Sequence, residues 1–144
     1  MAKIKLGTRP KSFKRVVKFP MLDGSEGAIE VTYKYRTLTE FGKFVDAWTK
    51  AANAKAQADV DQREADRKAA EEKGEDVDLA FNTVLRNAQA DANADYIMNI
   101  AEGWNLDEAF ELDAVRQLCD ELPAAAAAVM DSYRAALTEG RLGN

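Results

Sequence analysis

The sequence contains no histidine, the side chain most often used as a general base, as the activator of a nucleophile and as a metal ligand. Its three serines, Ser12, Ser25 and Ser132, lie in no nucleophile motif. A glycine-rich phosphate-binding loop is also missing. We therefore expect neither an enzyme nor a bound metal or cofactor.

Cysteine and long apolar runs are equally scarce. Cys119 is the one cysteine, which excludes an internal disulfide and fits a reducing compartment. It falls on the apolar stripe of a predicted helix, so we expect a buried thiol rather than a reactive one. No stretch reaches the roughly 18 apolar residues that cross a bilayer. The basic N-terminus is not followed by the apolar segment of a secretory signal, and we expect no membrane association.

One acidic stretch has part of the spacing of a calcium-binding loop. The residues at positions 1, 3, 5, 9 and 12 of that pattern are Asp91, Asn93, Asp95, Asn99 and Glu102. Position 6, where the sharp turn requires glycine, is Tyr96. The same stretch suits a helix with its acids outward, and we favour the helix.

Charge is distributed unevenly along the 144 residues. Residues 1–19 carry seven lysines and arginines and no acid, so the rest of the chain is strongly acidic to give the total of −5. A basic arm could contact nucleic acid, but no aromatic residues interleave a basic stripe. A solvated tail and an edge strand whose lysines discourage aggregation explain the same pattern.

The N-terminal quarter has the period-two alternation of β-strands. Apolar residues alternate in 13–19 and more regularly in 28–36, and Pro20, Asp23-Gly24 and Gly27 supply turn residues between them. The sequence predicts a β-hairpin with one buried face. Because two strands alone are marginally stable, helices must cover that face.

A long helix follows the hairpin. Thr37 and Glu40 have the spacing of a capping box, and large apolar residues then recur at helical spacing as far as Trp48. From 49 to 76 only Val60 is an apolar residue larger than alanine, although helix formers dominate. A helix over 38–73 would be about 50 Å long. Gly74 is its expected C-cap, and Asp76 is the expected N-cap of the next helix. Its distal part either projects as an alanine-rich arm or frays.

The remaining sequence predicts three more helices. One spans 76–102 and is ended by Gly103, and a helical pair occupies 103–144, with Pro123 at the start of the last helix. The fold class is therefore α+β, mostly helical: a single domain over 1–144 with an N-terminal β-hairpin followed by about four helices. Its segments are a basic tail (1–12), the hairpin (13–36), the long charged helix (37–73), the second helix (76–102) and the C-terminal pair (103–144).

The linker "EGWNLDEAF" (102–110) carries Trp104, Leu106 and Phe110, although connections on the surface normally have little apolar content. These side chains either attach the linker to the core or present an apolar surface to a partner. We favour the first alternative, because interior aromatics dominate domain cores. The candidate anchors, structural or partner-binding, are Trp104, Leu106, Phe110, Trp48 and Tyr133.

The C-terminal third combines a Gly-Trp pair, an acidic position, a Phe before a leucine-rich helix that ends in Pro, an inward Tyr and a final Gly-Asn. These positions are Gly103, Trp104, Asp107, Phe110, Leu118, Leu122, Pro123, Tyr133 and Gly143-Asn144. In this pattern the sequence resembles the phage and prophage tail assembly chaperones of long-tailed phages. The hairpin and "LTEFGKFVDAW" are compatible with it, and the match is weakest over 50–76. The resemblance implies a protein of the bacterial host cytoplasm, absent from the mature virion, that binds the tape measure protein and helps recruit tail tube protein.

Two other functions remain open from the residues alone. A structural minor tail or connector protein of the virion is the first alternative, and a small nucleic-acid-binding regulator is the second. Self-association into a homo-oligomer is left open as well.

Overall fold

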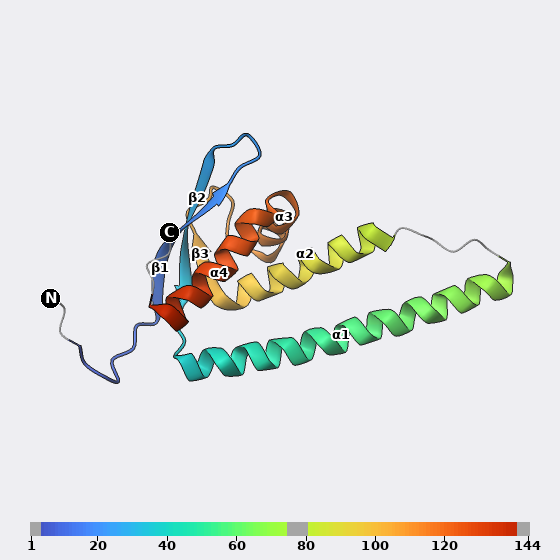
Figure 1. The fold of residues 1–144 in the computed structure, drawn as a ribbon, viewed down its shortest axis with the longest axis horizontal. Helices are drawn as coiled ribbons and strands as arrows, with labels where there is room; N and C mark the ends of the chain where they lie inside the picture. The colour runs from blue at the N-terminus through green and yellow to red at the C-terminus, as the bar shows by residue number, and fades with distance from the viewer. Residues whose placement is uncertain (1–3, 75–80, 141–144) are drawn as a thin grey trace.

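The computed structural model describes residues 4–74 and 81–140 as two layers, a small sheet and a set of helices (Figure 1). In chain order the elements are β1 (Ser12–Pro20), β2 (Glu26–Lys34), α1 (Leu38–Lys73), α2 (Phe81–Ile100), β3 (Ala101–Trp104), α3 (Leu112–Glu121) and α4 (Pro123–Glu139). The predicted fold class, a mostly helical α+β protein with an N-terminal hairpin and four helices, is confirmed.

The hairpin forms as its alternation predicts. Strands β1 and β2 pair antiparallel from Ser12 opposite Lys34 to Pro20 opposite Glu26. Glycine is required at Gly27, because a Cβ there would lie 2.7 Å from the Phe19 ring. The inward side chains, which α4 and its neighbours cover, are Val17, Phe19, Ile29, Val31 and Tyr33.

A third strand, which the sequence analysis missed, completes the sheet in the order β1-β2-β3. The prediction that the second helix runs to 102 and is ended by Gly103 is wrong: α2 ends at Ile100, and Gly103 lies opposite Thr32 in a strand. Asn105 extends this pairing, since its backbone N–H donates to Glu30 O (3.1 Å) and its Oδ1 accepts from Glu30 N–H (2.9 Å). Pairing with β2 therefore overrides the local preference for helix.

The caps predicted for the long helix are present. The Thr37 hydroxyl accepts from Glu40 N–H (3.1 Å), and the Glu40 carboxylate accepts from Thr37 N–H (2.9 Å). The hydrogen bond from Thr37, followed by the Arg9 guanidinium, lowers the pKa of Glu40 to about 2. Gly74 ends the helix in the left-handed conformation, with φ of 70°. The predicted cap at Asp76 lies outside the described residues.

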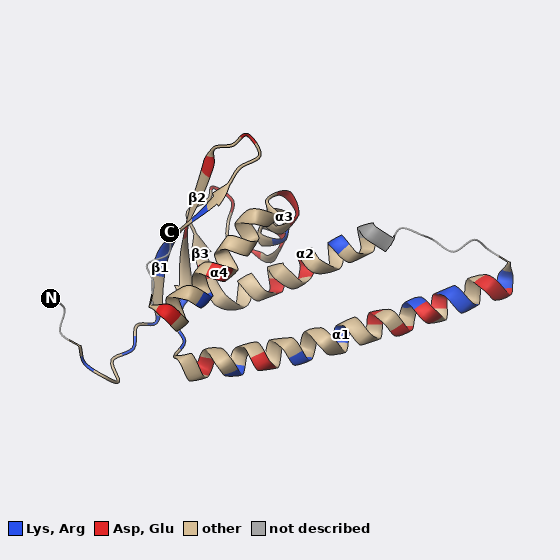
Figure 2. Ribbon diagram, in the orientation of Figure 1, with Lys and Arg blue, Asp and Glu red and all other residues tan. Residues whose placement is uncertain are grey.

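The distal part of α1 projects from the body as a continuous helix, the first of the two alternatives (Figure 1). Phe41 is the buried residue of this helix. Figure 2 shows acids and bases interspersed along the distal part, and Arg67 pairs there with Glu64 (2.6 Å) and Glu71 (2.7 Å). Such pairs contribute a few tenths of a kcal/mol each, so the arm is held by local interactions.

The C-terminal helical pair also forms as predicted. Leu122 alone separates α3 from α4, Pro123 begins α4, and Gly140 caps it with φ of 64°. The helices α2, α3 and α4 pack on one another, α2 also contacts β2 and β3, and α4 lies against β1. Within residues 4–74 and 81–140, no helix combines the length and the apolar character needed to cross a membrane.

We predict that residues 53–73 exchange their amide hydrogens much faster than α4. These residues are almost all exposed and bury no large apolar side chain, so local opening costs little free energy. Hydrogen-exchange mass spectrometry on the isolated monomer measures this, with the buried segment around Val129 and Tyr133 as the slow reference. Slow exchange across 55–72 would contradict the prediction and indicate packing of the arm.

Candidate partner-binding surfaces

The five candidate anchors lie in three separate places. Tyr133 is in the core, Trp48 is on α1 facing α2, and Trp104, Leu106 and Phe110 belong to the linker between β3 and α3. The structure therefore does not gather them into one site, and each place is described in turn.

Tyr133 belongs to a buried aromatic cluster between the hairpin and the helices. Its side chain is 0% exposed, and the rings of Phe13, Tyr33 and Phe41 lie within 5.2–6.2 Å of it, centroid to centroid. The Tyr133 hydroxyl donates to Lys34 O and accepts from Arg36 Nη1, both at 2.9 Å. Burial raises the pKa of Tyr133. A side chain so placed stabilises the fold and is not available to a partner.

The linker is attached to the body through Trp104. Its indole Nε1 donates to Glu108 O (2.7 Å), and its ring meets Phe110 edge-on at a centroid distance of 5.1 Å. Both side chains are half-buried and pack against the core. Edge-on aromatic pairs contribute about 0.5–1.5 kcal/mol beyond the area they bury. These contacts support a structural role for the apolar linker.

A shallow depression of about 220 Å³ remains beside the linker. Trp104 and Leu106 line it together with Leu118 and Leu122 of the α3 region, and Glu108 and Glu121 lie at its edge. The linker therefore still offers a small apolar surface with acidic neighbours.

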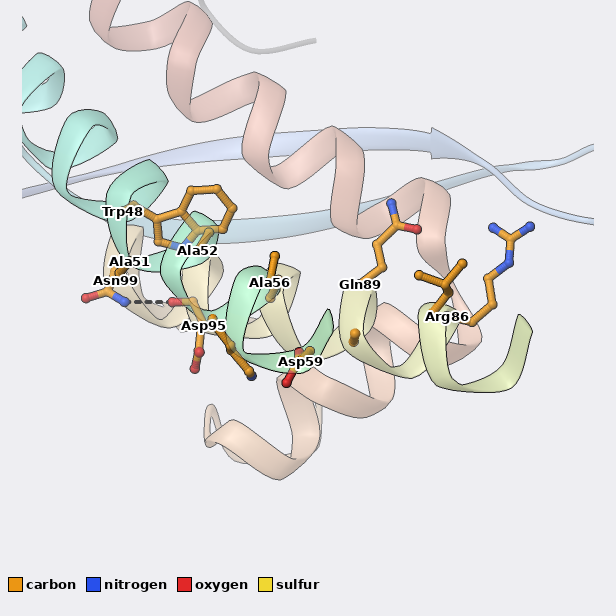
Figure 3. Close-up of a pocket in the computed structure, with 13 residues that line it drawn as sticks. Trp48, Ala51, Ala52, Ala56, Asp59, Arg86, Gln89, Asp95 and Asn99 are labelled. Atoms are coloured by element: carbon orange, nitrogen blue, oxygen red, sulfur yellow. Dashed lines mark hydrogen bonds between the residues drawn. The ribbon is translucent and has the colours of Figure 1, made fainter. Parts of the chain in front are cut away.

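A larger groove, of about 750 Å³, lies between α1 and α2. Figure 3 shows Trp48 at one end and Arg86 at the other, with alanines such as Ala52 and Ala56 between them. The Trp48 ring meets Tyr96 edge-on at 5.2 Å, and Phe44 also packs on Tyr96 at 5.3 Å. Trp48 was predicted as an anchor, but the groove was not predicted. The alanines that line it have the same helical spacing as alanines on a helix face that is packed against a neighbour.

The stretch with partial calcium-loop spacing is helical. Asp91, Asn93, Asp95 and Asn99 lie in α2, where Asp91 pairs with Arg116 (2.5 Å) and Asn99 Nδ2 donates to Asp95 O (2.8 Å). Among the described residues, no three histidine, cysteine, aspartate or glutamate side chains are placed to hold a metal ion. This part of α2 thus makes one contact within the helix and one with α3.

Basic residues of the N-terminal segment are paired with acids of the same chain. Arg9 pairs with Glu40, and on the outer face of the sheet Lys14 and Lys18 lie 3.9 Å from Glu30 and Glu26 respectively. These carboxylates reduce the attraction that the segment would have for phosphates. The arrangement favours the edge-strand explanation of the basic charge.

We predict that Trp104→Ala lowers the free energy of unfolding by about 2–3 kcal/mol, somewhat less than for a fully buried tryptophan. The loss comes from the packing against Phe110 and the hydrogen bond to Glu108 O. Trp104→Phe, which retains a ring, should cost less. Chemical denaturation of the three proteins checks this. Unchanged stability with impaired partner binding would instead make 102–110 a partner-binding surface.

We predict that Cys119 reacts very slowly with thiol reagents in the native protein. The side chain is 5% exposed, and burial raises its pKa to about 11. At about pH 8 only about one thiol in a thousand is then ionised. Labelling followed by mass spectrometry, with and without denaturant, measures the difference. Equal rates in both conditions would contradict a buried thiol.

Comparisons with known proteins identify the family. The model of the phage tail assembly chaperone family matches residues 1–144, the whole chain. No curated protein and no solved structure matches. The match extends over the hairpin, the long helix and the linker as well as the C-terminal third that carries the resemblance. The chain belongs to the phage tail assembly chaperone family.

Proposed function

We propose that this chain binds the tape measure protein during tail assembly, keeps it from aggregating and assists its meeting with tail tube protein. The family match over all 144 residues carries the proposal. We further propose that it acts in the cytoplasm of the bacterial host and is absent from the mature virion.

The described surface supports a binding role of this kind. A groove of about 750 Å³ and a separate depression of about 220 Å³ both have apolar residues in their walls and charged residues at their edges. Amphipathic helices are commonly recognised by such surfaces, which cover an apolar stripe and leave the polar face in water. Transient covering of apolar stripes on a long helical client is what a chaperone must provide.

We predict that co-expression with this chain moves the tape measure protein of the same phage from the insoluble to the soluble fraction. The two proteins should co-purify, because binding shields apolar surface that otherwise drives aggregation. Western blotting of both fractions measures the shift, with an unrelated small helical protein co-expressed as the control. A tape measure protein that stays insoluble and does not co-purify would contradict the proposal.

Mass spectrometry of purified virions separates this function from the alternative of a minor tail or connector protein. A chaperone should be missing from the particles, whereas a structural subunit should be present in a fixed ratio to tail tube protein. A fixed ratio would replace the proposed function by the structural one.

A further inference from the structure

The groove between α1 and α2 is open to solvent, and alanines form part of both its walls. Ala51, Ala52 and Ala56 line it from α1, and Ala88 and Ala92 line it from α2, beside longer side chains such as Trp48, Leu85 and Gln89. At the alanines the walls lie close to the helix backbone, and the volume of about 750 Å³ falls in the range of sites that bind ligands. The space is large enough to receive side chains from a third element.

The two helices leave apolar surface uncovered along this groove. They meet where Phe44 and Trp48 pack on Tyr96, near the sheet end of both helices. Farther along, Leu85 lines the groove and is 49% exposed. An apolar face between two helices that is filled at one end and open along the rest has the form of a helical bundle that lacks one helix.

A second copy of this chain is poorly suited to fill the groove. The projecting part of α1 would be the accessible helix, and over 49–73 its one apolar residue larger than alanine is Val60. If alanines of a second α1 faced the alanines of the groove, most of its volume would stay empty. The atoms that line an empty space lack van der Waals contacts on that side. The small residues of the groove instead complement a helix that carries large apolar side chains.

The charged residues that line the groove indicate the rest of the partner's chemistry. Lys55 and Asp59 line it on α1, and Arg86 and Asp95 line it on α2. Each side thus offers one cation and one anion. A partner helix with both acids and bases beside its apolar stripe would meet opposite charges, whereas a strongly basic or acidic helix would meet repulsion on each side.

We propose that this groove binds one amphipathic helix of the tape measure protein, with large apolar side chains between the alanines and Trp48 against one end of the helix. This inference rests on the proposed function and adds the binding site and the kind of segment bound. From Trp48 to Asp59 the groove extends about 16 Å, which is three helical turns. The bound segment therefore presents apolar residues at i, i+3, i+4 and i+7.

Two matched pairs of substitutions test the site. Ala56→Arg places a long charged side chain in the groove, whereas Ala58→Arg makes the same change at an exposed position of α1 that does not line it. On α2, Leu85→Ser removes an apolar lining residue. Val84→Ser is its control, because Val84 is 48% exposed and does not line the groove. All four positions are exposed, so the variants should fold, and circular dichroism verifies this.

The probes are the full-length tape measure protein, captured by co-expression, and overlapping fragments of it titrated by calorimetry. We expect Ala56→Arg to weaken binding of the tightest fragment by about tenfold or more and Leu85→Ser by about fivefold, as removal of central apolar contacts does. The two control variants should stay within about twofold of the original protein. The tightest fragment should carry the apolar spacing described above.

The outcomes separate the site from the function. If the original protein binds the tape measure protein and all four variants bind equally well, the groove assignment is wrong while the proposed function stands. If the original protein binds no part of the tape measure protein, the proposed function fails first. A photo-crosslinker at position 56 that reacts with α2 or with a second copy, in the presence of the fragment, would also overturn the groove assignment.

Discussion

Two tyrosines join the strand β2 to the helix α4, and the rest of the fold is arranged around this joint. The Tyr33 hydroxyl donates to Val129 O (2.7 Å) on α4, and the Tyr133 hydroxyl of α4 donates to Lys34 O (2.9 Å) on β2. Both side chains are 0% exposed. Removal of one partner of either hydrogen bond would therefore leave a buried polar group unpaired, at a cost of about 1–3 kcal/mol in stability. The hairpin alone would be marginal, and this reciprocal contact fixes which helix covers its apolar face.

The two parts of α1 are held in different ways, depending on how far they lie from this joint. Near it, Phe41 of α1 packs edge-on against Tyr133, and Arg36 lies 4.3 Å from the centroid of the Phe44 ring, so the start of α1 is held to the body. Beyond Trp48 the apolar residues of α1 are alanines except for Val60, and the helix carries local ion pairs and side-chain hydrogen bonds. The groove along α2 follows directly from this change, because alanines are too small to bring the two helices into full contact.

This member of the phage tail assembly chaperone family thus combines a packed body with an open groove, which we propose as its binding surface. The linker 102–110 likewise combines packed side chains with a smaller open surface. Trp104 and Phe110 hold it by packing and by the hydrogen bond to Glu108 O, yet Leu106 still borders a depression beside α3. Side chains that stabilise the fold thus lie next to an open depression, so the effect of a substitution here must be measured on both stability and binding.

The sequence by itself determined the elements whose signals are local. Alternation in the hairpin, the capping box of Thr37 and Glu40, and the glycine cap at Gly74 act over a few residues, and each formed as predicted. Tertiary structure decided the strand β3, because a four-residue segment has no usable periodicity and forms by pairing with β2, some seventy positions earlier. Tertiary structure also decided the groove, because an alanine-rich helix face has the same sequence pattern whether or not a second helix packs against it. The candidate anchors were named from the sequence, but only packing distinguished the buried Tyr133 from Trp48, which is half-buried against Tyr96 and lines the groove.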